Sequence, residues 1–459
     1  MNKKTQLLSD APVSKALLAV GLPAMIGMMI NALYNLVDAY FVSGMGKSQM
    51  GAITVAFPLG QVVVGLGLLF GNGAASYISR LLGSGDTQTA DKAASTALYS
   101  SISVGAVIIA SAVIFLKPIL ILIGTTDTIM PYAVTYTRIY LISSILNIFN
   151  VTMNNLATSE GCAKTAMCAL LSGAVLNIAL DPLFISVFEL GVAGAAAATA
   201  ISQAVSSAVY IMYISEKKSV FSFRINKCSF TGNIILQILK IGVPTLIFQL
   251  LTSFSIVLIN RAAKPYGDSV ISGMGVVTRI ISMGSLMVFG YTKGLQPVAG
   301  YSFGARKYDR LKEAIKLSVI WTSIFCFVFG AAAAIFSVPL VSKFSKGDSQ
   351  MITVASAALR ANGLSFTLFG FYTVYSSLFL ALGKAKRGFV LGACRQGIFF
   401  IPVLYILTAF LKVNGVVYSQ PAADVLSALA AVVMAVQLHR ELNKNSQPGL
   451  PLDSQKMNA

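Results

Sequence analysis

Three acidic residues lie deep inside long apolar stretches of this 459-residue chain: Asp38, Asp181 and Asp424. An ionisable side chain in apolar surroundings is costly, so each is a candidate for binding a cation or a proton. Asn177 stands four residues before Asp181. On a helix this spacing puts the amide and the carboxylate on one face.

Thr199 completes the candidate set. The chain turns near Leu190, about midway between Asp181 and Thr199, so two antiparallel helices would hold both side chains at one depth. Asp38 and Asp181 each lie roughly 8–10 Å in from the outer ends of their helices, at about 1.5 Å per residue. Carboxylate, amide and hydroxyl oxygens suit a small hard cation such as Na⁺. Two neighbouring carboxylates could instead bind H⁺, and a third interpretation is interhelical hydrogen bonding alone.

The composition indicates what positions these residues. Hydrophobic residues make up 56% of the chain, charged residues 11%, and the mean hydropathy is +0.77. This excludes a soluble domain, which needs more charged surface. The five cysteines are scattered and His439 is the single histidine, so we expect no disulfide framework, zinc site or histidine-based catalysis.

The polar N-terminus has no signal-peptide pattern, and the remaining chain divides into twelve apolar segments. The all-α polytopic fold that we predict has membrane helices at 14–43, 50–82, 90–117, 130–158, 165–188, 192–215, 233–263, 270–304, 312–342, 352–382, 387–411 and 414–438.

The formal net charge of +18 follows from basic loops. The N-terminus, the C-terminal tail and the loops on their side carry about three times as many Lys and Arg as the opposite loops. We therefore expect a multi-pass protein of the cell membrane with both termini in the cytoplasm, and no nucleic-acid partner.

The chain also repeats itself. A shift of 221 residues places Gly21 and Pro23 on Gly242 and Pro244, and Gly73 and Gly83 on Gly294 and Gly304; a shift of 222 places Lys164 on Lys386. We predict two pseudo-symmetric six-helix lobes around a central cavity: an N-lobe at 1–215, a cytoplasmic linker at 216–232, a C-lobe at 233–440 and a cytoplasmic tail at 441–459. This layout is typical of transporters, while a channel would more often be an oligomer around one pore.

Several segments together resemble the multidrug and toxic compound extrusion (MATE) family, in its bacterial branch. They are NLVDAYFV around Asp38, LNIALDP around Asp181, GVAGAAAATAIS around Thr199, GNGAASYISRLLGSGD and LQPVAGYSFGA. The resemblance covers residues 14–440. It implies export of organic cations and drugs in exchange for Na⁺ or H⁺. It also implies roles for particular residues: Asp38, Asn177, Asp181 and Thr199 match the family's first-lobe cation site, Tyr34 a tyrosine beside it, and Pro23 a proline where the first helix can bend.

The second lobe departs from this pattern. Some family members have acids in helices 7 and 10, but here Gln249 stands in helix 7 and Ile259 is the repeat partner of Asp38. We therefore expect cation coupling in the first lobe only. Asp424 is expected to form an ion pair, with Arg360 and Arg279 at similar depth, rather than a second coupling site.

Basic and aromatic residues could line a substrate cavity. Arg279, Lys293, Arg360 and Arg395 fall within second-lobe segments; they either snorkel and pair locally or make the cavity receptive to zwitterions and anions. Aromatic stripes on helices 4 and 10 are usually packing, but aromatic faces suit lipophilic cations. The candidate substrate-binding residues are Tyr34, Tyr136, Tyr140, Asn150, Asn154, Gln249 and Lys293.

The predicted function is therefore a cation-coupled antiporter that exports amphipathic organic compounds by alternating access. The alternative is a flippase for lipid-linked or polysaccharide precursors, which would need paired arginines in a first lobe that has one deep arginine, Arg138. The sequence shows no catalytic constellation that would favour a membrane-embedded enzyme. The expected partners are the lipid bilayer and small organic substrates, the expected state is a monomer, and no cofactor is expected beyond Na⁺ or H⁺.

Overall fold

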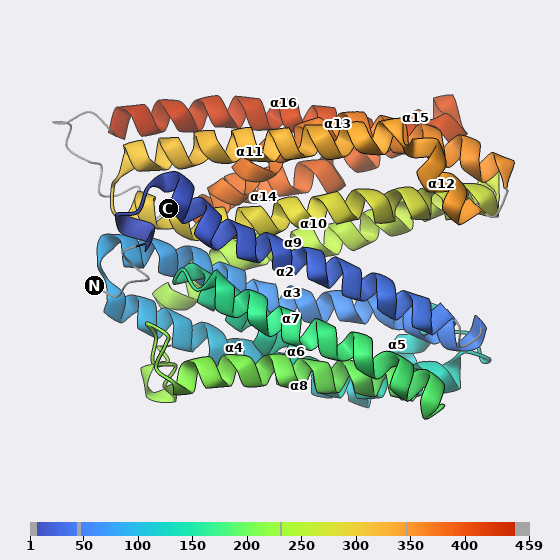
Figure 1. The fold of residues 1–459 in the computed structure, drawn as a ribbon, viewed down its shortest axis with the longest axis horizontal. Coiled ribbons are helices and arrows are strands. Elements are labelled where there is room, and N and C mark those ends of the chain that lie inside the picture. The colour runs from blue at the N-terminus through green and yellow to red at the C-terminus, as the bar shows by residue number, and fades with distance from the viewer. Residues whose placement is uncertain (1–6, 44–46, 230–231, 346–347, 446–459) are drawn as a thin grey trace.

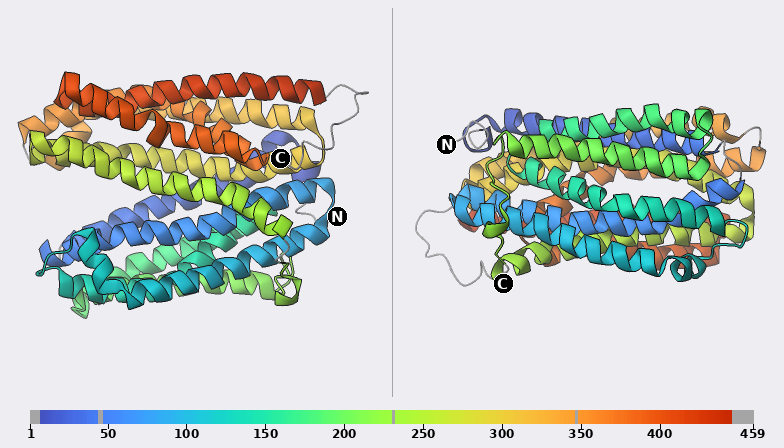
Figure 2. Two further views of the ribbon diagram at one scale, coloured as in Figure 1. Left: turned by 180° about the vertical axis from the view of Figure 1, so that it is seen from behind. Right: turned by 90° about the horizontal axis from the view of Figure 1, so that it is seen from below.

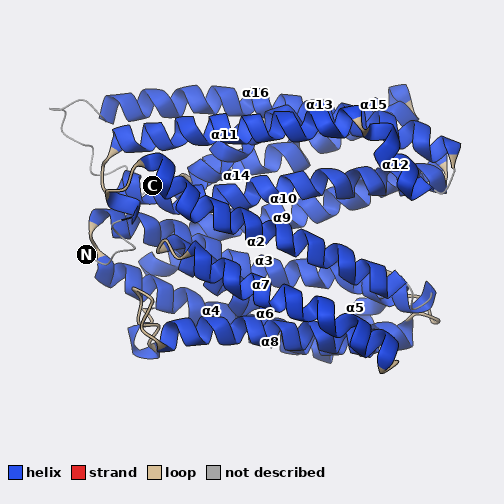
Figure 3. Ribbon diagram, in the orientation of Figure 1, coloured by secondary structure: helices blue, strands red, loops and turns tan. Residues whose placement is uncertain are grey.

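A computed structural model describes residues 7–43, 47–229, 232–345 and 348–445, without the side chains at 35–40, 42, 43, 47 and 268. These residues form helices joined by short loops, with no strand among them (Figure 3). The first half contains α2 (Val13–Ser43), α3 (Lys47–Ser84), α4 (Thr87–Ile114), α5 (Leu116–Ile123), α6 (Met130–Ser159), α7 (Ala163–Pro182), the π-helix η1 (Leu183–Val187) and α8 (Gly191–Ser215).

The second half repeats this order after a linker that includes the 3₁₀ turn η2 (Ile225–Lys227). It contains α9 (Gly232–Ala263), the 3₁₀ turn η3 (Lys264–Tyr266), α10 (Asp268–Gly304), α11 (Tyr308–Ile335), α12 (Ser337–Ser345), α13 (Ser349–Ala381), α14 (Ala385–Ala393), the π-helix η4 (Cys394–Ile398), α15 (Phe400–Leu411) and α16 (Val413–Asn445). The predicted all-helical fold with twelve long segments is confirmed, with α14, η4 and α15 making up the eleventh.

Two predicted segments end earlier than expected. The third stops at Ile114 and the ninth at Ile335, and the short helices α5 and α12 follow them. Pro118 and Pro339 lie in the first turns of these short helices. Proline has no backbone N–H and clashes with the carbonyl group four residues before it, which is where each of these two long helices ends. Other prolines, such as Pro23, lie inside helices that continue. The same break therefore occurs at corresponding places in both halves.

Eleven of the described helical segments are long and apolar enough to cross a bilayer. α6 is not among them because polar side chains, such as Asn150, Thr152, Asn154 and Asn155, interrupt its apolar sequence. These side chains are buried, since α6 packs against α3, α4 and α8. A helix shielded from lipid by its neighbours can carry such groups if they are hydrogen-bonded.

The helices form two lobes, α2–α8 and α9–α16 (Figures 1 and 2). The lobes lie closest at the end where α2 begins and α16 ends, and they diverge toward the other end (Figures 1 and 2). Where they meet, α2 packs on α10 and α3 packs on α9. The contact therefore joins the first two long helices of each repeat.

Glycines allow this contact to be close. A Cβ atom on Gly294 would lie 2.3 Å from the Cα of Gly21, and a Cβ on Gly73 would lie 2.2 Å from the carbonyl oxygen of Ile238 and 3.2 Å from the nitrogen of Gly242. The internal repeat relates Gly21 to Gly242 and Gly73 to Gly294, so it converts one glycine contact into the other. A two-fold axis relates residues at an interface in the same way. The repeated glycines of the sequence are therefore contact points between the lobes.

Candidate functional site: a polar cavity in the first lobe

Four first-lobe helices, α2, α6, α7 and α8, enclose a small cavity of about 50 Å³. This is enough for a few water molecules or a small cation, since one water needs roughly 10–15 Å³ of such volume. The residues that line it are Asn31, Tyr34, Asn150, Ala169, Leu170, Gly173, Ala174, Asn177, Thr199, Ser202, Gln203, Ser206 and Tyr210. Amide and hydroxyl groups thus converge from all four helices.

Asn177 and Asp181 share one face of α7, as their spacing predicts. The side-chain nitrogen of Asn177 donates a hydrogen bond to Oδ1 of Asp181, 3.3 Å away. Asp181 is completely buried and Asn177 is 1% exposed. Because Asn177 also lines the cavity, the amide connects the buried carboxyl group to it.

Two oxygen atoms of the cavity wall have no hydrogen-bond partner among the described residues. Oδ1 of Asn177 and the hydroxyl oxygen of Ser202 are buried and have no hydrogen bond with any described residue. A buried polar atom without a partner is costly, and such atoms often mark the place of a water molecule or an ion. Thr199 faces the same cavity, and its hydroxyl donates to the carbonyl oxygen of Ala195 at 3.1 Å. Its oxygen lone pairs can still accept a hydrogen bond or coordinate a cation.

Asp38 lies on α2, one helical turn beyond Tyr34. Its side chain is outside the described residues, so its predicted meeting with Asp181 is not tested. Tyr34 and Asn150 line the cavity, as a site near Asn177 requires. Pro23 lies inside α2, which continues through it as a helix.

The other predicted substrate residues lie elsewhere. Asn154 donates to the hydroxyl of Tyr210 at 3.3 Å, within the packing of α6 on α8. Tyr136 and Tyr140 stack with ring centroids 5.9 Å apart. Gln249 on α9 donates to Gln61 on α3 at 2.6 Å and so bridges the lobes.

Sequence reasoning missed part of the cavity wall. Asn31 precedes Tyr34 by three residues, and Ser202, Gln203, Ser206 and Tyr210 follow Thr199 on α8. Positions 199, 203, 206 and 210 recur at helical spacing, so this polar stripe was readable from the sequence. The stripe could have extended the predicted site along α8.

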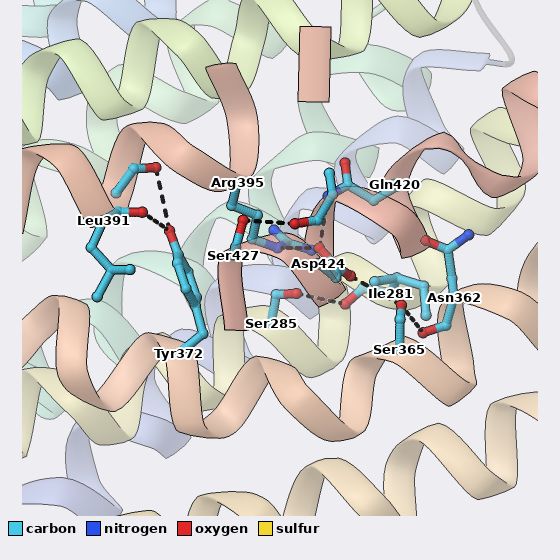
Figure 4. Close-up of polar contacts among 12 residues, drawn as sticks. Ile281, Ser285, Asn362, Ser365, Tyr372, Leu391, Arg395, Gln420, Asp424 and Ser427 are labelled. Carbon is cyan, nitrogen blue, oxygen red and sulfur yellow. Dashed lines mark hydrogen bonds and ion pairs between the residues drawn. The ribbon is translucent and has the colours of Figure 1, made fainter. Parts of the chain in front are cut away.

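A second polar cluster lies in the other lobe (Figure 4). Nε of Arg395 contacts Oδ1 of Asp424 at 2.8 Å, and the two side chains are 9% and 4% exposed. Asp424 also accepts hydrogen bonds from Ser365 at 3.0 Å and from Gln420 at 2.9 Å. The arginine carbon Cζ lies 4.6 Å from the ring centroid of Phe369. The carboxylate is thus held by three helical segments, η4, α13 and α16.

The expected ion pair of Asp424 is present, but its partner is not the one suggested by depth. Arg279 and Arg360 are exposed, and Nε of Arg360 donates to Ser337 at 2.9 Å. Equal depth does not bring side chains together when their helices face other neighbours. Lys293, the remaining base, is partly buried on α10.

The described residues contain no group of three or more His, Cys, Asp or Glu side chains that could hold a metal ion. A small cation in the first-lobe cavity would instead be bound by amide and hydroxyl oxygens together with carboxylate, which is a donor set for a hard monovalent ion or a proton.

Known proteins share this arrangement. The MatE family model matches residues 23–183 and 244–406. This chain belongs to the MATE family. The second matched range starts 221 residues after the first, which is the same shift that superimposes the repeated glycines.

Named MATE relatives match over nearly the whole chain. The Multidrug export protein MepA of Staphylococcus aureus (strain MRSA252) is 30% identical over 433 residues, 94% of this chain and 95% of the relative. That of Staphylococcus haemolyticus (strain JCSC1435) is 29% identical over 434 residues, with the same coverage.

Solved MATE structures have the same fold. The crystal structure of MATE in the straight conformation has a TM-score of 0.92 and 25% identity, covering 97% of this chain and 100% of that one. The outward-facing conformation of a multidrug resistance MATE family transporter of the MOP superfamily has a TM-score of 0.91 and 25% identity, with 97% and 99% covered. The resemblance drawn from the sequence motifs is therefore confirmed, and the chain is a multi-pass membrane transporter.

Proposed function

We propose that this MATE protein exports amphipathic organic compounds in exchange for a small cation, Na⁺ or H⁺, bound in the first-lobe cavity. The observation that carries the proposal is the buried Asp181–Asn177 pair beside a cavity. Its wall includes two oxygen atoms, on Asn177 and Ser202, that have no hydrogen-bond partner in the part of the chain that the structure describes. The relatives named as multidrug export proteins support the substrate class.

The cation would be bound by Asp38, Asn177, Asp181 and Thr199, and Ser202 adds a further oxygen. A buried carboxylate is stable as an anion only beside a cation or strong donors. Na⁺ would satisfy it by coordination, while H⁺ would neutralise it. Either ion therefore stabilises the form of the first lobe that encloses it.

α2 offers a physical route for coupling. Toward its C-terminal half α2 contributes Asn31 and Tyr34 to the cavity. Around Pro23 it packs on α10 of the other lobe, because Gly294 lies against Gly21 and Gly290 lies against Met25. A cation that changes how the far part of α2 packs can bias the bend at Pro23 and thus the contact between the lobes. The divergence of the lobes at one end supports alternating access (Figures 1 and 2).

We assign the closed end, which carries the basic loops, to the cytoplasm, and the open end to the outside. The N-lobe at 1–215 and the C-lobe at 233–440 would move as units about the linker at 216–232. Because one chain supplies both lobes, we propose a monomer. Tyr34, Tyr136, Tyr140, Asn150, Asn154, Gln249 and Lys293 remain the proposed substrate contacts.

The test is drug efflux in everted membrane vesicles with a Na⁺ gradient and a pH gradient imposed separately. Asp38→Asn and Asp181→Asn should each abolish gradient-driven export. An amide has no negative charge to balance Na⁺ and cannot take up and release H⁺ as a carboxylate does. Membrane levels should match those of the unmodified protein.

Asp309→Asn is the matched control, since the Asp309 side chain is 96% exposed at the start of α11. It should export normally. Full export by both Asp38→Asn and Asp181→Asn would contradict the proposal, and dependence on one gradient only would identify the coupling ion.

A further inference from the structure

The internal repeat relates the second-lobe ion pair to the first-lobe cavity. The shift of 222 residues that places Lys164 on Lys386 continues without a gap along the next helix and places Gly173 on Arg395. The same shift places Ser202 on Asp424. Both first-lobe residues line the cavity.

The packing supports this correspondence independently of the numbering. α8 packs on α6 and α7 in the first lobe, and α16 packs on α13 and on the η4–α15 segment in the second. Within these pairs, a Cβ on Gly173 would lie 3.1 Å from the carbonyl oxygen of Ser202, and Arg395 contacts Asp424 at 2.8 Å. The related positions are thus neighbours in both lobes.

The two sites differ in what fills them. In the first lobe Gly173 lines the cavity without a side chain, and α8 packs closely on it, since a Cβ there would lie 2.1 Å from Oγ of Ser206. In the second lobe the side chain of Arg395 extends to Asp424 and is 9% exposed, with Ser365 and Gln420 completing the shell of the carboxylate (Figure 4). A guanidinium group therefore joins the two positions that the repeat relates to the cavity-lining residues Gly173 and Ser202.

We propose that Arg395 is a tethered cation that permanently occupies the second-lobe counterpart of the part of the first-lobe cavity that Gly173 and Ser202 line. This inference rests on the proposed function, because it takes the first-lobe cavity as a cation site. It explains why the second lobe keeps a buried carboxylate without acting as a second coupling site: Asp424 is already neutralised by the chain itself. Removing the arginine side chain would open a site for a small free cation beside Asp424.

The test replaces Arg395 with the residue that the repeat places there. Purified full-length Arg395→Gly is unfolded by heat while guanidinium chloride or NaCl is titrated in the low millimolar range, with N-methylglucamine chloride keeping the ionic strength constant. We expect a saturable rise of a few degrees in Tm, because a ligand that binds only the folded state stabilises it. The rise should be absent in Arg395→Gly/Asp424→Asn.

All proteins are also prepared with Asp181→Asn, so that the first-lobe site does not contribute. The proposed function is checked by comparing the unmodified protein with Asp181→Asn alone: if it fails, the Na⁺ response of the two will be the same. The proposal about Arg395 is checked separately, by the Asp424-dependent response of Arg395→Gly in the Asp181→Asn background. The two failures are therefore distinguishable. Arg360→Gly is the matched control, since Arg360 is exposed and its Nε donates to the hydroxyl of Ser337 rather than to a carboxylate; it should show no saturable response.

An ion pair that only ties the helices together gives a different result. It predicts that Arg395→Gly and the double variant respond equally to the cations, and this outcome would overturn the proposal. Should Arg395→Gly not be isolable, Arg395→Gln and Arg395→Lys are compared by export in vesicles with and without added guanidinium. Rescue of the glutamine variant alone supports the proposal, and no rescue contradicts it.

Discussion

At the residue scale, the first-lobe cavity depends on a few oxygen atoms rather than on many charges. The side-chain nitrogen of Asn177 donates to Asp181. Oδ1 of Asn177 and the hydroxyl oxygen of Ser202 have no hydrogen-bond partner among the residues that the structure describes. These are the atoms that a cation would coordinate.

Ser202→Ala should weaken cation binding without harming the fold. The hydroxyl has no hydrogen-bond partner among the described residues, so its loss should leave the fold unchanged. It should weaken the free energy of cation binding by about 1 kcal/mol, which is roughly threefold to tenfold in affinity. The measurement is the Na⁺ concentration, or the pH for a proton-driven protein, at half-maximal export. Ser215→Ala, on the exposed end of α8, should leave this value unchanged, and an equal effect of both substitutions would contradict the assignment.

At the element scale, two buried acids fasten the linker between the lobes to the first lobe. Glu160, at the end of α6, is 1% exposed and accepts hydrogen bonds from the Tyr213 hydroxyl and the Val220 backbone nitrogen, both at 2.6 Å. Asp91 on α4 accepts from the backbone of Ser222 at 2.8 Å and pairs with Lys227. The linker is thus held against α4, α6 and α8 rather than free between the lobes.

Glu160→Ala should destabilise the first lobe by about 3 kcal/mol, because buried donors would lose a charged acceptor. The apparent melting temperature and protease cleavage of the linker measure this. Glu216→Ala provides the comparison: its ion pair with Lys218 is exposed, so less than about 1 kcal/mol should be lost. Equal stability of both variants would show that the linker is not held by Glu160.

At the scale of the whole molecule, the lobes meet through pairs of glycines. Gly294 on α10 lies against Gly21 on α2, and no side-chain movement can relieve a Cβ there because the neighbouring atoms are backbone. Closure at this end therefore requires residues without side chains. The internal repeat supplies them in matching places on both lobes.

Gly294→Ala should hold the lobes apart at the closed end and reduce export about tenfold or more, since overpacking costs roughly 1–3 kcal/mol. Gly275→Ala is the control on the same helix, where no atom lies within 4 Å of the added carbon, and it should be neutral. A disulfide between cysteines placed at Asn72 and Thr245, which are hydrogen-bonded at 2.9 Å across the lobes, reports closure. Undiminished cross-linking and export in Gly294→Ala would contradict this role.

Composition and periodicity alone determined the membrane class, the twelve long helices, the repeat and the shared face of Asn177 and Asp181. Each of these features belongs to a single helix or follows from comparing two stretches of the chain. They can therefore be predicted from the order of the residues alone. The breaks before α5 and α12 did not follow from Pro118 and Pro339 alone, because Pro23 and Pro244 lie inside helices that continue.

Only the tertiary structure decided which helix faces which. It paired Asp424 with Arg395 instead of Arg360, brought Ser202 beside Asn177, and turned Gln249 toward Gln61. Depth along a helix follows from residue number, but rotation and neighbours follow from how all the helices pack together. The surroundings of the two repeat-related positions, with Gly173 lining a cavity and Arg395 bound to Asp424, therefore became visible only in three dimensions.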